Sequence, residues 1–95
     1  MKDKIRSKEV DNFFDAVLAL ENREECCRFF EDICTINEIL SISQRLEVAS
    51  MLREKKSYKE IAEATGASTA TISRVNRAFT YGEDGYEMIF RKLGK

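Results

Sequence analysis

Short polar and basic side chains are concentrated between residues 57 and 79, in the segment SYKEIAEATGASTATISRVNRAF. Hydroxyl and guanidinium groups are the side chains with which proteins contact the bases and phosphates of DNA. At helical spacing, this segment predicts a helix, a turn at Gly66 and a second helix whose outer face is polar. The side chains that we expect to contact DNA are Lys59, Ser68, Thr69, Ala70, Thr71, Ser73 and Arg77.

The remaining residues of this segment fit a helix-turn-helix at about residues 58–79. Gly66 can adopt positive φ in a tight turn at no steric cost, and Ser68 or Thr69 can cap the next helix by accepting a backbone N–H. Ile61 and Ala62 fall on the inner face of the first helix, and the apolar residues that should face them from the second helix are Ile72, Val75 and Phe79. The alternative is a pair of ordinary amphipathic helices joined by a glycine.

The charges are distributed unevenly, although the 16 Lys and Arg nearly balance the 17 Asp and Glu. Residues 1–44 carry six basic and ten acidic side chains, a balance of −4. Residues 45–80 carry seven and four, a balance of +3, and residues 81–95 carry three of each. The positive segment coincides with the predicted helix-turn-helix, and in a dimer its attraction for phosphates would double.

The residue types give no support to an enzyme. The chain has no His and no glycine-rich phosphate loop, and the adjacent acids Glu24-Glu25 and Glu83-Asp84 belong to a helix start and a turn, where they do not converge. We therefore expect no catalytic residue and no cofactor.

Three cysteines, Cys26, Cys27 and Cys34, lack the two-to-four-residue spacing of a zinc site and lie in an apolar helical stretch. We expect buried, reduced thiols and no bound metal. The first 30 residues lack the apolar core of a signal peptide, and no apolar run reaches membrane-spanning length. These features indicate a cytoplasmic protein without a membrane partner.

The other segments also have a helical period, which predicts an all-α fold of about six helices in a single domain over residues 1–95. Thr35-Ile36-Asn37-Glu38 is a capping box that opens a long helix to about Glu54. Apolar residues surround much of this helix, more than a chain of this size can cover. The excess predicts a two-fold homodimer, and the alternative is an over-hydrophobic monomer.

The stretch GASTATISR, preceded by SYKEIAEAT and ISQRLEVASMLREKK, resembles the tryptophan repressor superfamily. With its YGEDGYEMI tail, the whole chain resembles the YerC/YecD branch of that superfamily. The resemblance implies six helices in an intertwined homodimer, and operator contacts at Lys59, Thr69, Ala70 and Ser73. It also implies a different recognition sequence, because Ala62 occupies a contact position where the repressor has a lysine.

The resemblance further implies a ligand pocket. The threonine and two arginines that hold tryptophan in the repressor have counterparts in Thr35, Arg45 and Arg74, and arginine forks suit carboxylates. The repressor has a glycine after the second arginine so that the indole can lie flat. Val75 stands there in this chain, and its branched side chain would occupy the space of the ring. Ala78 replaces the serine that accepts the amino group of the ligand.

Three roles of Arg45 and Arg74 remain open: pairing with local acids such as Glu38 or Glu47, binding a smaller or differently shaped anion, or binding tryptophan. Val75 disfavours tryptophan and favours constitutive DNA binding, with the valine as a wedge between the second helix and the core. We expect a sequence-specific transcriptional regulator, a repressor in the simplest case, that acts as a homodimer on double-stranded DNA. The alternative is a helix-turn-helix module for protein interaction or scaffolding, without sequence-specific DNA binding.

Overall fold

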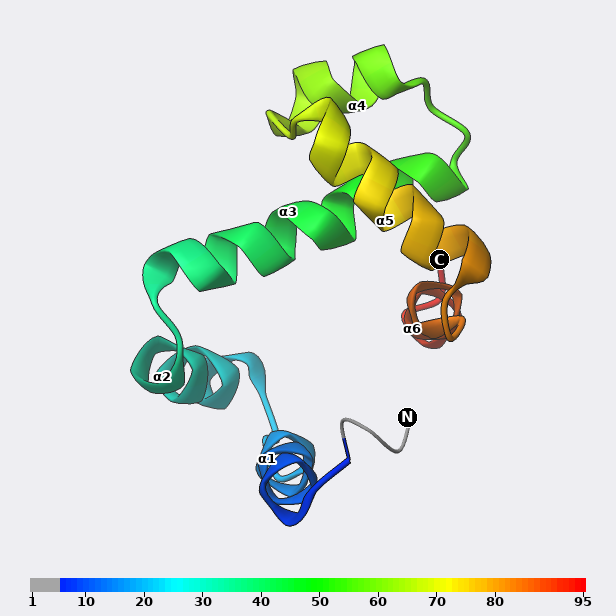
Figure 1. Ribbon diagram of the computed structural model, residues 1–95. Coiled ribbons are helices and arrows are strands. Elements are labelled where there is room, and N and C mark those ends of the chain that lie inside the picture. Colours follow the sequence, from blue (N-terminus) through cyan, green and yellow to red (C-terminus); the bar gives the residue numbers. More distant parts are fainter. Residues whose placement is uncertain (1–5) are drawn as a thin grey trace. The chain divides into compact units, whose positions relative to one another are not determined.

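The computed structural model describes residues 6–95, which form six α-helices and no strand. Figure 1 shows the helices in chain order. Their bounds are Lys8–Leu18 for α1, Arg23–Ile33 for α2, Ile36–Arg53 for α3, Tyr58–Thr65 for α4, Thr69–Tyr81 for α5 and Gly85–Lys92 for α6. The prediction of an all-α fold of about six helices is confirmed. The chain divides into two compact units, with the boundary between Ile39 and Leu40 inside α3.

Each helix of the first unit begins at a polar cap. The Ser7 hydroxyl accepts a 3.1 Å hydrogen bond from the Val10 N–H before α1, and the Asn22 side chain accepts one of 2.9 Å from the Glu25 N–H before α2. These caps satisfy backbone donors that have no partner inside a helix.

The predicted capping box at the start of α3 is confirmed. The Thr35 hydroxyl accepts a 3.1 Å hydrogen bond from the Glu38 N–H, and the Glu38 carboxylate accepts one of 2.8 Å from the Thr35 N–H. The bond from the Thr35 backbone, followed by that with its hydroxyl, lowers the pKa of Glu38.

The first unit has no buried side chain on α1 or α2. The rings of Phe13 and Phe29 stack with centroids 6.3 Å apart, but Leu18 remains 82% exposed. The prediction of buried cysteines is wrong for this chain, because Cys26 and Cys34 are half-buried and Cys27 is exposed. Two short helices offer too little apolar surface to cover each other's stripes completely.

The second unit contains the hydrophobic core of the described residues, with contributions from α3, α4, α5, α6 and the turn between α4 and α5. In Figure 1, α5 crosses in front of the carboxyl-terminal half of α3, and α4 lies above α3. Fully burying a Val, Ile or Phe side chain contributes about 1.5–3 kcal/mol to the stability of the folded state. The buried residues are Val48, Ala49, Ile61, Ala67, Ile72, Val75 and Phe90.

The turn from α3 to α4 is a Schellman motif. The Lys55 N–H donates to the Leu52 carbonyl at 2.9 Å, and the Lys56 N–H donates to the Met51 carbonyl at 3.0 Å. Lys55 itself adopts φ 64°, in the left-handed region. The motif satisfies the last carbonyls of α3 and redirects the chain into α4.

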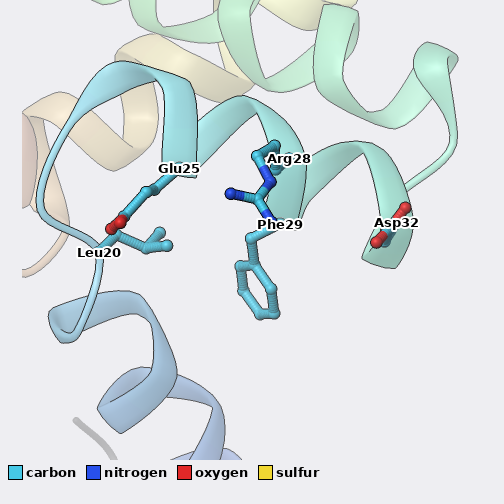
Figure 2. Close-up of a pocket in the computed structure, with 5 residues that line it drawn as sticks. All are labelled: Leu20, Glu25, Arg28, Phe29 and Asp32. Atoms are coloured by element: carbon cyan, nitrogen blue, oxygen red, sulfur yellow. The ribbon is translucent and has the colours of Figure 1, made fainter.

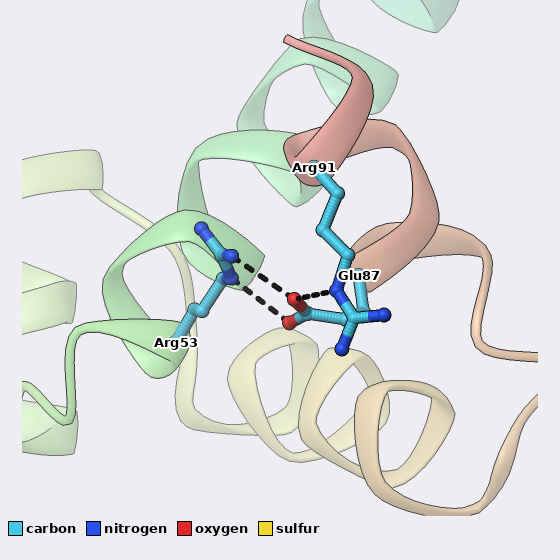
Figure 3. A network of polar contacts seen from close by, with 3 residues as sticks. All are labelled: Arg53, Glu87 and Arg91. Atoms are coloured by element: carbon cyan, nitrogen blue, oxygen red, sulfur yellow. Dashed lines mark hydrogen bonds and ion pairs between the residues drawn. The ribbon is translucent and has the colours of Figure 1, made fainter. Parts of the chain in front are cut away.

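An ion-pair network joins the end of α3 to α6 (Figure 3). The Arg53 guanidinium forms two parallel hydrogen bonds, of 2.8 and 2.9 Å, with the Glu87 carboxylate, which also accepts a 2.9 Å bond from Arg91 Nε. The same guanidinium lies 5.6 Å from the Phe90 ring centroid. The bonds from Arg53 lower the pKa of Glu87 and raise the pKa of Arg53.

The helices described between residues 6 and 95 include none that is both long and apolar enough to cross a membrane.

Candidate nucleic-acid interface

The turn between α4 and α5 is fixed by local hydrogen bonds. Gly66 adopts φ 73°, as predicted, and its N–H donates to the Ala62 carbonyl at 2.9 Å. The Thr65 hydroxyl donates to the Ile61 carbonyl at 2.7 Å and accepts from the Ala67 N–H at 3.1 Å. Because Ala67 is buried, this turn is anchored in the core, and the start of α5 is anchored with it.

Ser68 is the cap of α5, which settles the choice between Ser68 and Thr69. Its hydroxyl accepts a 3.1 Å bond from the Thr71 N–H and donates to the Thr71 hydroxyl at 3.1 Å. Thr71 is half-buried, whereas Thr69 is exposed. The Ser68 and Thr71 hydroxyls thus serve the cap, and Thr69 presents its hydroxyl to solvent at the leading end of the helix.

Helix α5 has one buried and one exposed face. Ile72 is fully buried and Val75 is 1% exposed, so both belong to the core. Of the α5 residues that we expected to contact DNA, Thr69, Ala70, Ser73 and Arg77 are exposed, as is Ser68 at the cap, whereas Thr71 is half-buried. Arg74 is exposed as well. Ala70, Thr71 and Arg74 also line a recess of about 260 Å³. Short side chains at the leading end leave the backbone open to close approach by a groove.

Two long-range hydrogen bonds hold α4 in place, and sequence reasoning missed both. The Asn76 side chain on α5 donates to the Tyr58 hydroxyl at 3.2 Å, at the first residue of α4. The Gln44 side chain on α3 donates to the Thr65 carbonyl at 3.1 Å, at the last residue of α4. Their partners are 18 and 21 residues apart, so no local pattern could have found them.

The basic side chains of this surface are available for phosphates. Lys59, Arg74 and Arg77 are exposed. Within residues 6–95, the ion pairs are Arg53–Glu87 and Arg91–Glu87, so no carboxylate neutralises these three charges at short range. Exposed cations without a local counter-ion are suited to binding a polyanion.

The residues of the predicted ligand pocket lie in different environments. Arg45 is half-buried, Arg74 is exposed and Val75 is buried in the core cluster. Neither arginine forms an ion pair with Glu38, Glu47 or another acid of the described chain. The pairing of these arginines with local acids, one of the three roles left open, is therefore not seen. Thr35 is engaged in its capping box.

An apolar recess of about 390 Å³ lies between α3, α5 and α6. The ring of Tyr86 at its edge stacks on Phe79, with centroids 6.4 Å apart. The lining residues are Leu46, Ala78, Glu83, Gly85, Tyr86 and Ile89. Ala78, which replaces the serine of the repressor, thus faces an apolar surface.

A further recess of about 340 Å³ lies in the first unit, on α2 and the connection before it (Figure 2). Its lining combines two acids, one arginine and two apolar residues: Leu20, Glu25, Arg28, Phe29 and Asp32. The Glu25 carboxylate already accepts a 2.9 Å hydrogen bond from the Glu21 N–H. In the part of the chain that the structure describes, no three acidic or cysteine side chains gather as metal ligands.

Comparison with known proteins gives consistent results. The sequence profile of the family described as Trp repressor protein matches residues 8–94. The chain is 62% identical over 91 residues to the uncharacterized protein YerC of Bacillus subtilis (strain 168), covering 96% of this chain and 88% of that protein.

Two crystal structures share the fold. A TrpR-like protein from Eubacterium eligens superposes with a TM-score of 0.95 at 58% identity, over 98% of this chain and 96% of that one. A candidate Trp repressor from Staphylococcus aureus gives a TM-score of 0.94 at 52% identity, over 97% and 92% of the two chains.

Proposed function

This chain belongs to the Trp repressor family, and from that premise we propose that it is a sequence-specific DNA-binding transcriptional regulator, a repressor, that acts as a homodimer without tryptophan. The matched family is one of regulators, not of enzymes. We also retain the single-domain assignment of residues 1–95 as a proposal.

The division of α5 into two faces carries the proposal of DNA binding. Ile72 and Val75 anchor the helix in the core, while Thr69, Ser73 and Arg77 project from its exposed face. A helix held in this way can enter a major groove with its leading end and read base edges with short polar side chains. Arg77, and Lys59 on α4, would contact phosphates and set the position of the protein on the duplex.

The first unit supports the proposal of a homodimer. Its helices α1 and α2 bury no side chain, and large apolar residues such as Leu18 and Ile36 are exposed. Water-exposed apolar surface of this extent is usually covered by a partner. A second copy is the simplest partner, and a two-fold dimer would present two α5 helices to successive major grooves about 34 Å apart.

Burial of Val75 supports independence from tryptophan. The valine packs in one cluster with Val48 and Ala49 of α3, so its branched side chain fills space between α5 and α3. An indole ring could enter that space only by displacing a fully packed side chain, and such overpacking costs about 1–3 kcal/mol. We propose that Val75 holds α5 in its reading position permanently.

The test measures the DNA affinity of variants that lose a base contact and of variants that lose a phosphate contact. Each variant is tested on the operator duplex and on duplexes in which single base pairs are changed. Ser73→Ala and Thr69→Ala should change which bases are preferred, because they remove groups that reach base edges. Arg77→Ala and Lys59→Ala should weaken binding to all duplexes alike, because phosphates carry no sequence information.

Unchanged base preference in Ser73→Ala and Thr69→Ala would contradict the assignment of α5 to the groove. If none of the four substitutions changed DNA binding, and the protein captured a protein partner that stayed bound at high salt, the alternative of a protein-interaction module would be favoured.

A further inference from the structure

Lys55 adopts a backbone conformation that is unfavourable for a lysine. It occupies the position after the α3 helix cap with φ 64°, where the Schellman motif requires the left-handed region. Glycine is the usual residue there, because a Cβ atom crowds the neighbouring carbonyl in this conformation. A residue kept in a disfavoured conformation points to a use for its side chain.

Lys55 is one of three exposed lysines within five residues, with Lys56 and Lys59. The acids nearest in sequence are Glu54 and Glu60. The Glu60 carboxylate accepts a 3.1 Å hydrogen bond from the Ser57 hydroxyl, which turns it towards the cap of α4. None of the three lysines forms an ion pair within the described residues. Their charges are therefore open to an external anion.

The lysines stand beside the helix that carries the proposed reading face. The Asn76 side chain binds the Tyr58 hydroxyl at 3.2 Å, which fixes the first turn of α4 against α5 one residue before Arg77. Lys55 is three residues before Tyr58, so its backbone lies within about 11 Å of that anchor. A duplex lying along α5 would then have phosphates within reach of this turn.

We infer that Lys55 and Lys56, in the turn between α3 and α4, contact the DNA phosphate backbone and extend the interface beyond the helix-turn-helix. This inference rests on the proposed function. It assigns to the turn an electrostatic role without base readout, in contrast to the exposed face of α5. On this inference, the positive charge of Lys55 has a use at a position where glycine would fit the backbone better.

The test measures the salt dependence of binding to a selected operator duplex for wild type, Lys55→Gly and Lys55→Asn. The slope of log K against log salt is negative, and each lost phosphate contact reduces its magnitude by about 0.9, so the slope of a dimer should become less steep by about 1.8. Both replacements tolerate the left-handed conformation, so Tm should stay the same or rise. The preferred bases should not change.

Two controls separate a contact from a general effect of charge. Lys55→Arg should keep the wild-type slope. Lys92→Gln removes an exposed lysine of α6, at the opposite end of α5 from α4 in Figure 1, and should also keep it. Unchanged slopes for Lys55→Gly and Lys55→Asn, or an equal loss in Lys92→Gln, would overturn the inference while leaving DNA binding intact. Failure of the wild-type protein to bind any duplex would overturn the proposed function itself.

Discussion

The two units of the chain bury their apolar side chains to very different extents. In residues 40–95, seven apolar side chains contributed by four helices and one turn are buried. In the first unit, α1 and α2 bury none, although each has an amphipathic sequence. The first unit is rich in aromatic rings that contact one another, such as Phe13 and Phe29, yet they remain partly accessible.

This difference in burial suggests that the two units have different roles. The second unit has its own core, which holds the helix-turn-helix in shape and fixes α5 through Ile72 and Val75. The apolar surface of the first unit remains exposed, and a second copy of the chain could bury it. We therefore propose that residues 40–95 read DNA and that dimer formation depends chiefly on residues 6–39.

The largest expected effect is on dimer formation. Leu18→Glu places a carboxylate in the proposed interface of each protomer, and an unpaired buried charge costs several kcal/mol. We expect the dissociation constant of the dimer to rise by about three orders of magnitude or more, measured by analytical ultracentrifugation. Tyr81→Glu is the matched control in the second unit, because Tyr81 is 84% exposed and Leu18 is 82% exposed. Equal weakening by both substitutions would contradict the division of tasks.

The next largest expected effect is on the stability of the core of the second unit. Ile72→Ala removes a fully buried side chain and should destabilise the helix-turn-helix by about 2–5 kcal/mol in chemical denaturation. Thr80→Ala changes an exposed residue of the same helix and should stay within about 0.5 kcal/mol of wild type. Similar stabilities of the two variants would mean that the core does not lie where we describe it.

The smallest effect concerns the attachment of α6. Because the pKa of Glu87 is lowered by Arg53, its ionised form stabilises the folded state above the ordinary glutamate pKa, and this contribution is lost as pH falls through the lowered value. Glu87→Gln should lower Tm at neutral pH, and its difference from wild type should shrink below about pH 4.3. A difference in Tm that is constant between pH 7 and pH 3 would refute the role of this ion pair.

Local features of the fold could be predicted from the sequence. The capping box of Thr35 and Glu38 and the positive φ of Gly66 each depend on residues within one turn of the chain. The same holds for the outer face of α5, because Ile72 and Val75 fix which side is inward. Short-range spacing is sufficient for such features.

Other features depend on residues that are distant in sequence, or on an unusual conformation. The pairing of Arg53 with Glu87 spans 34 residues, and that of Tyr58 with Asn76 spans 18. The Schellman turn at Lys55 was missed because the sequence signal for it is glycine. Burial of the cysteines was predicted wrongly, because an apolar stripe does not reveal whether its cover lies within the same chain.

The most direct test of the account is selection of bound duplexes from a random DNA pool at near-physiological salt, with and without L-tryptophan. We predict one enriched sequence with two half-sites about one helical turn apart, and the same sequence in both conditions. Enrichment only with tryptophan would contradict the role assigned to Val75. Absence of enrichment in both conditions would contradict the proposal that the protein reads DNA.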